Sequence, residues 1–248
     1  MNENGINDKN LNKNGIKNFI LRIDLIKNKI LDISKIADAM ASYFDRAEKR
    51  QLSNFTLKFT NDDSKLTKEE VFNFVLISET KSVSMTFSEI ENAFWIKSSQ
   101  YRNNLIYKEL IKKVIEEIST ICNETEAKRI GLRYINEFKC EKISHVGQIY
   151  GKRLTTITKA MMKEENQSRV IGMEHYNNDE YKLRLQYGIP NNFYPSVITL
   201  CPLLLDIDSY TECTCNISDF EKIISDLNHA AYGKFIKEMN PKYLEELK

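Results

Sequence analysis

The stretch KRIGLRYINEF, residues 128–138, decides the fold because apolar and charged side chains alternate along it. One face of an extended chain would carry Ile130, Leu132, Tyr134 and Phe138. The other face would carry Arg129, Gly131, Arg133 and Glu137. A period of two residues predicts a β-strand that is buried on one face only. The apolar face is expected to meet helices, which leaves the arginines on a face open to water or to a ligand.

The same alternation of apolar and polar residues recurs on both sides of this strand. In the first half it predicts strands near residues 19–27, 55–59, 72–76 and 83–87, the last continuing through 94–97. In the second half it predicts strands near residues 168–176, 180–188 and 196–208. The polar interval at residues 61–70 is predicted to be a loop.

Apolar residues spaced three and four apart predict the helices. They fall at residues 32–49, 102–121 and 148–165, and in a final helix that begins near Ser218. Ser218 and Glu221 have the spacing of a capping box, in which two side chains bond free backbone N–H groups at the start of a helix.

The order of these elements predicts the fold class. Each half reads as strand, helix, three strands and helix, and short turns join the strands without crossover helices between them. We therefore expect an α+β protein with a largely antiparallel, curved sheet and helices on one face. Residues 19–248 are expected to form a single domain, with residues 19–122 and 123–248 as candidate repeats of one β-α-β-β-β-α unit. The asparagine-rich residues 1–18 are expected to be a disordered tail.

Composition and charge exclude several classes of protein. The 248 residues include 36 lysines plus arginines and 35 aspartates plus glutamates, so no overall field favours nucleic acid or an anionic membrane. The longest apolar run, residues 197–205, is well short of the roughly 18 residues that span a bilayer. The five cysteines form no CxxC pair and the N-terminus does not read as an export signal, so we expect reduced thiols and a cytoplasmic location.

The polar strand face holds the candidate binding residues. Alternation places on it Arg22, Asp24, Arg129, Gly131, Arg133, Arg184, Asp206 and Asp208. Arginines supply fixed planar donors for carboxylate or phosphate, and the aspartates are expected to be their ion-pair partners. Gly131 lacks a Cβ, which permits close approach of a ligand or curvature of the sheet. The plainer alternative is that these charges only cover a solvent-exposed sheet with cross-strand pairs.

Few residue patterns point to catalysis. The chain contains no GxGxxG, GxxxxGK[ST], HExxH or GxSxG motif, and His145, His175 and His229 are far apart in sequence. We therefore name no catalytic residue, no metal ligand and no cofactor. The best enzyme-like feature is the pair Asp206 and Asp208, which share a strand face and could bind Mg²⁺ while arginines hold a phosphate.

Residues 129–136 read Arg-Ile-Gly-Leu-Arg-Tyr-Ile-Asn, and in this the chain resembles a family of sporadically distributed, uncharacterised bacterial proteins with the same mid-chain segment. The resemblance continues at residues 205–208 and at Phe235 in the final helix, and it covers residue 19 to the end. The chain departs from the family at Leu227-Asn228, where the family often has Leu-His, and at Met239-Asn240, where it often has Ile-Thr. The resemblance implies no established activity, and the family's patchy distribution suggests an accessory gene, such as one used in defence.

Together these observations predict a non-enzymatic module that binds an unidentified protein partner or an anionic ligand through its polar sheet face. Two alternatives stay open: a metal-dependent enzyme that acts on phosphate esters, and a structural homodimer with a self-complementary face. Neither nucleic acid nor a membrane is an indicated partner.

Overall fold

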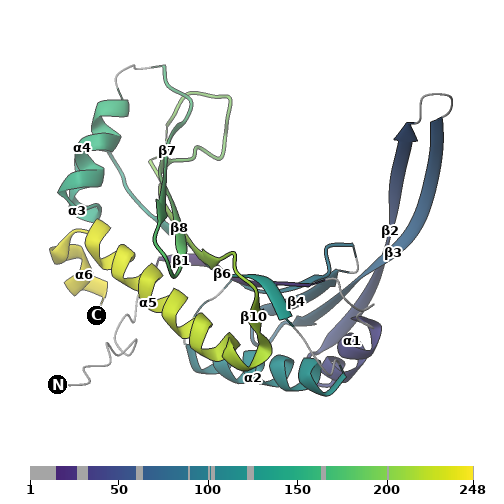
Figure 1. The fold of residues 1–248 in the computed structure, drawn as a ribbon. Coiled ribbons are helices and arrows are strands. Elements are labelled where there is room, and N and C mark those ends of the chain that lie inside the picture. Colours follow the sequence, from purple (N-terminus) through teal and green to yellow (C-terminus); the bar gives the residue numbers. More distant parts are fainter. Residues whose placement is uncertain are drawn as a thin grey trace, which may run out of the picture.

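In the computed structural model one continuous sheet runs through both halves of the chain (Figure 1). The structure describes residues 15–26, 33–59, 64–88, 90–99, 101, 104–121, 126–162, 166–199 and 201–247. The first half contains β1 (Ile16–Leu25), α1 (Ile33–Ala41), β2 (Arg46–Phe59), β3 (Ser64–Ser78), β4 (Val83–Ser88), β5 (Ala93–Ser98) and α2 (Asn104–Ile121). The second half contains β6 (Glu126–Phe138), α3 (Val146–Ile149), α4 (Lys152–Met161), β7 (Val170–Asn177), β8 (Lys182–Ile189), β9 (Leu203–Thr211), β10 (Cys215–Asn216), α5 (Phe220–Glu238) and α6 (Pro241–Leu247).

The strands of the sheet lie in the order β2-β3-β4-β5-β1-β6-β9-β8-β7, and β10 pairs with the start of β6. Every strand pair that the structure describes is antiparallel. The prediction of an α+β fold with a largely antiparallel, curved sheet is therefore confirmed.

The central pair of the sheet is β1 with β6, two strands that are far apart in sequence. On either side of this pair the strands follow in the same order, with β5, β4 and β3 beside β1, and β9, β8 and β7 beside β6. β2 is an additional strand at the outer edge of the first half. The two halves thus share an element order, while their origin in a duplicated unit stays a prediction.

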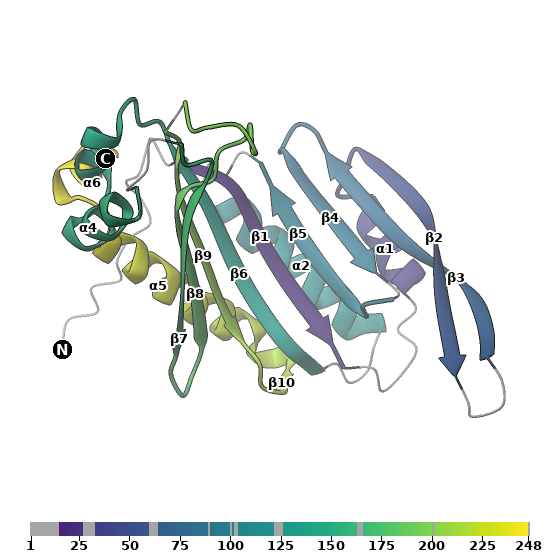
Figure 2. The same cartoon turned by 90° about the horizontal axis from the view of Figure 1, so that it is seen from above.

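The two faces of the sheet differ in what covers them. α1, α2 and α5 lie along the convex face, and no described helix covers the concave face (Figures 1 and 2). The apolar residues of β6 point toward the helices, so Ile130 and Leu132 are buried. Two groups of buried apolar residues lie on this side, one under each half of the sheet, and Tyr134 packs against both. The Tyr134 hydroxyl also donates to Oδ1 of Asn228 in α5, at 2.6 Å.

The hairpin of β2 and β3 is longer than the sequence predicts. β2 pairs with β3 from Arg46↔Ile77 to Phe59↔Ser64, whereas β4 pairs only with residues 73–78 of β3. The outer part of the hairpin therefore projects beyond the rest of the sheet (Figures 1 and 2). The prediction of a loop at residues 61–70 is wrong for residues 64–70, which pair with β2; residues 61–63 lie outside the described part of the chain.

The structure has shorter helices than the sequence predicts in two places. The first ends at Ala41 because the backbone from Arg46 onward pairs with β3. Asp45 fixes this change of direction, since its Oδ2 accepts hydrogen bonds from the N–H of Glu79 at 2.9 Å and from the hydroxyl of Ser78 at 3.2 Å. The helix predicted at residues 148–165 is observed as α3 and α4, which are separate helices.

Three predicted boundaries also shift. The strand predicted at residues 196–208 is observed as β9, which begins at Leu203. α5 begins at Phe220 after a 3-10 turn at Ile217–Asp219, and its N-cap, Asp219, makes no side-chain capping bond, so the capping box at Ser218 is wrong. β1 begins at Ile16, so residues 16–18 are not part of a tail, and residues 1–14 lie outside the described ranges.

Candidate functional site

All eight candidate binding residues lie on the concave face of the sheet. Cross-strand partners share a face, and the register aligns three rows across β1, β6, β9 and β8. These rows are Asp24↔Arg129, Arg22↔Gly131↔Tyr210 and Ile20↔Arg133↔Asp208↔Arg184. Asp206 lies two residues before Asp208 on the same strand and therefore on the same face. The alternation in the sequence thus predicted the shared face correctly.

Five of these side chains form two neighbouring ion-paired groups, Arg133–Asp206 and Arg129–Asp208–Arg184, which we together call the arginine cluster. Its shortest contacts join Arg133 to Asp206. Nε of Arg133 lies 2.9 Å from Oδ1 of Asp206, and Nη2 lies 2.6 Å from Oδ2. These hydrogen bonds raise the pKa of the Arg133 guanidinium above its ordinary value. Arg133 is therefore a positive charge held in one orientation.

Asp208 lies between the other two arginines of the cluster. Its Oδ2 is 3.2 Å from Nη2 of Arg184 and 3.6 Å from Nη2 of Arg129. Burial raises the pKa of the Asp208 carboxyl, although the positive charges of Arg129, Arg184 and Arg133 act in the opposite direction. The distance of 3.6 Å between Arg129 and Asp208 is too long for a hydrogen bond. The N–H donors of Arg129 can therefore bind a ligand without breaking a hydrogen bond to Asp208.

The carboxylates form the deeper layer of the arginine cluster and the guanidiniums form the outer layer. The side chains of Asp206 and Asp208 are 3% and 11% exposed. Those of Arg129, Arg133 and Arg184 are 25%, 35% and 30% exposed. Three positive charges thus lie above two negative ones. A ligand on this face would meet guanidinium groups first and an excess of one positive charge.

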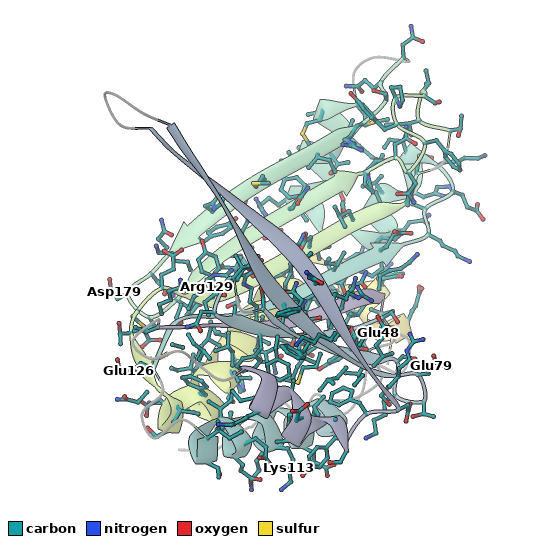
Figure 3. The ribbon with its side chains drawn as sticks, turned by 90° about the vertical axis from the view of Figure 1, so that its right-hand side faces the viewer. Glu48, Glu79, Lys113, Glu126, Arg129 and Asp179 are labelled. Carbon is teal, nitrogen blue, oxygen red and sulfur yellow. The ribbon has the colours of Figure 1, made fainter. Side chains whose placement is uncertain are left out.

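Gly131 provides the space that Arg129 occupies. A Cβ at Gly131 would lie 3.3 Å from the Arg129 Cζ, so the guanidinium folds back over the glycine backbone. The same guanidinium lies 4.8 Å from the ring centre of Tyr210, in cation–π contact. Figure 3 shows Arg129 toward the side of the sheet where Glu126 and Asp179 also lie. The missing Cβ of Gly131 therefore leaves room for the guanidinium of Arg129 on the same strand.

A second charged group lies beside the arginine cluster on β1. Nε of Arg22 is 2.7 Å from Oδ1 of Asp24, and Arg22 also pairs with Glu91. Its guanidinium lies 5.7 Å from the ring centre of Trp95 on β5. Arg22 is thus held by two carboxylates and one ring, which leaves it less free for a ligand than Arg129.

The sequence interpretation missed the two aromatic residues of this face. Trp95 pairs with Arg22, and Tyr210 pairs with Gly131, so both belong to the rows described above. The signal was present, because Tyr210 continues the alternation of Asp206 and Asp208, and Trp95 alternates with the buried Phe94 and Ile96. Sequence alone does not distinguish these residues from core residues, because aromatic side chains on strands commonly pack in the core.

The residues of the cluster are poorly arranged for metal chemistry. No group of three or more His, Cys, Asp or Glu side chains that could hold a metal ion occurs among the described residues. Each of the two aspartates already faces arginine, at 2.6 Å for Asp206 and 3.2 Å for Asp208. The arrangement can bind and orient an anionic group, since it offers planar donors above fixed counter-charges.

Comparison with known proteins adds no family to this geometry. A scan against protein-family models and a search of curated protein sequences both match nothing. No helix in the described ranges is long and apolar enough to cross a membrane. The resemblance through residues 129–136 therefore stays a prediction, and the function must be argued from the concave face itself.

Proposed function

We propose that this protein is a non-enzymatic binding module whose concave sheet face accepts an anionic group of a partner. The observation that carries the proposal is the layering of the arginine cluster, in which partly exposed arginine side chains lie above more deeply buried carboxylates. The buried carboxylates hold the arginines in place, so that a ligand does not have to order them. Carboxylates and phosphates are the groups that match planar, paired N–H donors.

Arg129 and Arg184 are the arginines that would contact the ligand most directly. Arg133 commits two of its nitrogens to Asp206, whereas Arg129 and Arg184 share the single carboxylate of Asp208. Two cations around one carboxylate leave a net positive charge, which an incoming anion would neutralise. Binding should therefore weaken as the salt concentration rises.

Isothermal titration calorimetry with two simple polyanions, hexaglutamate and tripolyphosphate, tests the proposal. In the presence of EDTA we expect the wild type to bind at least one of them saturably. Arg129→Gln and Arg184→Gln should each weaken that binding tenfold or more. The matched control is Arg46→Gln, which removes the same charge from the edge strand β2, where Arg46 is 56% exposed and pairs with Glu48.

The control separates a site from a general charge effect. Affinity that falls equally in Arg46→Gln and Arg129→Gln would mean that the polyanions respond only to net charge, and the proposal would fail. It would also fail if neither polyanion bound. Thermal unfolding of each variant checks that the sheet is intact.

Metal titration distinguishes the enzymatic alternative. We expect Mg²⁺, Mn²⁺ and Zn²⁺ to give no binding heat that depends on Asp206 and Asp208, because both carboxylates are engaged by arginines. Tight metal binding that disappears in the Asp206→Asn/Asp208→Asn double variant would instead favour an enzyme that acts on phosphate esters.

A further inference from the structure

The loop between β8 and β9, residues 190–199, exposes large apolar side chains. Phe193 is 63% exposed, Tyr194 57% and Val197 43%. Single exposed apolar residues are common, but three of them within five positions of one loop form a local apolar patch. Such patches mark surfaces that are covered by a partner.

A buried asparagine holds this loop in one conformation. Asn191 is only 4% exposed, and its Nδ2 donates to the carbonyl oxygens of Ser168 and Ser196, both at 2.7 Å. Its Oδ1 accepts a hydrogen bond from the N–H of Phe193 at 3.1 Å. Asn191 also adopts a φ of 47°, a left-handed conformation that asparagine tolerates better than most residues. Asn191 thus joins the start of the loop by hydrogen bonds to Phe193 and Ser196 within the loop and to Ser168, which precedes β7.

Arg169 fixes one of the exposed rings. Its Nε donates to the carbonyl oxygen of Pro190 at 2.8 Å, and its guanidinium lies 4.5 Å from the ring centre of Tyr194. Aromatic and arginine side chains in fixed positions are typical of the residues that contribute most to protein–protein binding. Because the ring is already ordered, a partner would gain contact area at a small cost in conformational entropy.

The loop lies at one end of the surface that carries the arginine cluster. β8 presents Arg184, Gln186 and Gly188 on the concave face, and the loop begins directly after β8. Gly188 is four residues from Arg184, a separation of about 13 Å at roughly 3.3 Å per residue. The loop follows the end of β8 and turns toward the concave side of the sheet (Figures 1 and 2). One extended molecule could therefore touch both features.

We propose that the partner is an extended protein segment that places an acidic side chain on the arginine cluster and an apolar side chain against Phe193 and Tyr194. The inference rests on the proposed function and adds the class of the partner. The separation of about 13 Å along β8, with the first residues of the loop beyond it, corresponds to roughly five residues of extended chain. The segment would thus carry aspartate or glutamate about five residues from an aromatic or aliphatic residue.

The charges on the concave face favour a peptide over a nucleic acid or a lipid surface. A phosphodiester strand carries a charge on every nucleotide, whereas the arginine cluster has an excess of only one positive charge. Glu91, with a side chain 45% exposed, lies beside Arg22 and would repel a longer polyanion. A flat bilayer cannot follow a concave sheet, so it could not touch the arginine cluster and the loop together.

Selection from a displayed library of random 16-residue peptides on the full chain tests this inference. We expect the enriched peptides to combine acidic and apolar residues about five positions apart. Fluorescence anisotropy of the best labelled peptide should show a tenfold or greater loss of affinity in Phe193→Ser and in Arg129→Gln. The matched controls are Ile236→Ser, which removes an apolar side chain that is 38% exposed on α5, and Arg46→Gln; both should bind as the wild type does.

The variants separate failure of this inference from failure of the proposed function. If Arg129→Gln weakens the peptide but Phe193→Ser does not, the loop has no role and the inference is overturned while the anion site stands. If neither variant matters, or no peptide is enriched, both the inference and its partner class are wrong, and the polyanion titration decides the proposed function separately. Binding of labelled oligo(dT) or of anionic vesicles that requires Phe193 would also overturn the peptide assignment.

Discussion

Arg133 on β6 and Asp206 on β9 are joined by two hydrogen bonds, Nε to Oδ1 at 2.9 Å and Nη2 to Oδ2 at 2.6 Å. The register places Asp208, and not Asp206, directly opposite Arg133. Arg133 therefore reaches diagonally along the strand, which its length allows. This choice of partner leaves Asp208 to Arg129 and Arg184, so the unmatched positive charge of the arginine cluster lies at these two arginines.

The Arg133–Asp206 pair predicts that an arginine on a sheet surface contributes to stability. Arg133→Gln should lower the free energy of unfolding by about 2–3 kcal/mol, because it leaves a carboxylate that is 3% exposed without its charged partner. Leu132→Ala, at the adjacent buried position, should cost about 2–5 kcal/mol. Urea denaturation measures both.

Arg46→Gln is the control for this comparison, because Arg46 belongs to an exposed pair with Glu48. It should leave the urea midpoint unchanged. If Arg133→Gln also left the midpoint unchanged, Asp206 would have to be solvated in the protein, and the layered description of the arginine cluster would be wrong.

Asp208 predicts a pH dependence of opposite sign to that of most carboxylates. Burial raises the pKa of Asp208 in the folded protein, so the folded state holds this proton more tightly than the unfolded state does. Its contribution to stability is therefore present below the unfolded pKa and is lost as the pH rises through the folded pKa. The unfolding free energy of wild type minus that of Asp208→Asn should therefore fall as the pH rises above the ordinary pKa of an aspartate, about 4.

Paired denaturation curves at several pH values measure this difference. Asp208→Asn is the appropriate reference because it keeps the shape of the side chain and removes the titration. A difference that rises with pH would show that the attraction of Arg129 and Arg184 exceeds the cost of burial, which would reverse the direction of the shift.

Two glycines predict contrasting effects of one added methyl group. At Gly188 the φ is +127° and a Cβ would lie 2.1 Å from the carbonyl oxygen of Val170, so Gly188→Ala should destabilise the protein by at least about 2 kcal/mol. At Gly131 a Cβ would meet only the end of the Arg129 side chain, at 3.3 Å. Gly131→Ala should therefore stay within about 0.5 kcal/mol of the wild type while it displaces Arg129.

The useful consequence is a variant that alters the arginine cluster without altering the fold. Thermal unfolding together with the tripolyphosphate titration checks it, with Arg129→Gln as the reference for loss of the side chain. Wild-type affinity in Gly131→Ala would mean that the position of Arg129 over Tyr210 has no bearing on anion binding.

The sequence predicts which residues share a face far better than it predicts which residues touch. The face on which a residue lies follows from the period of two within its strand, so the sequence correctly predicts that the eight candidate residues share one face of the sheet. The central pairing of β1 with β6 depends on contacts between segments that are far apart in sequence, and no local pattern encodes it. Residues 64–70 are polar apart from Leu66, so their composition predicts a loop, although they pair with β2.

The depth of the charges could not be predicted either. Alternation places Arg133 and Asp206 on the same face, but it does not show that the aspartate is buried beneath the arginine. That layering depends on the length of the arginine side chain and on the diagonal contact between two strands. The role of Gly131 was likewise only half predicted, because the group that uses its missing Cβ is Arg129 of the same strand.

Another buried carboxylate, Glu238 of α5, identifies a position in the helical layer where substitution should lower stability. Its side chain is 1% exposed and lies 2.8 Å from Nη2 of Arg153 on α4 and 2.9 Å from Nζ of Lys234. Arg153 also pairs with Glu174 on β7 at 2.8 Å, so it links two helices and an edge strand. Arg153→Met should lower the free energy of unfolding by roughly 1–3 kcal/mol, less than for a carboxylate left wholly unpaired, because Lys234 still faces Glu238.

The control is Lys182→Met, which breaks an exposed ion pair between Lys182 and Glu212. Their side chains are 41% and 48% exposed, so the variant should leave the urea midpoint unchanged. Equal midpoints for the two variants would mean that Glu238 does not need Arg153, and that the contact between α4, α5 and β7 is maintained by apolar packing alone.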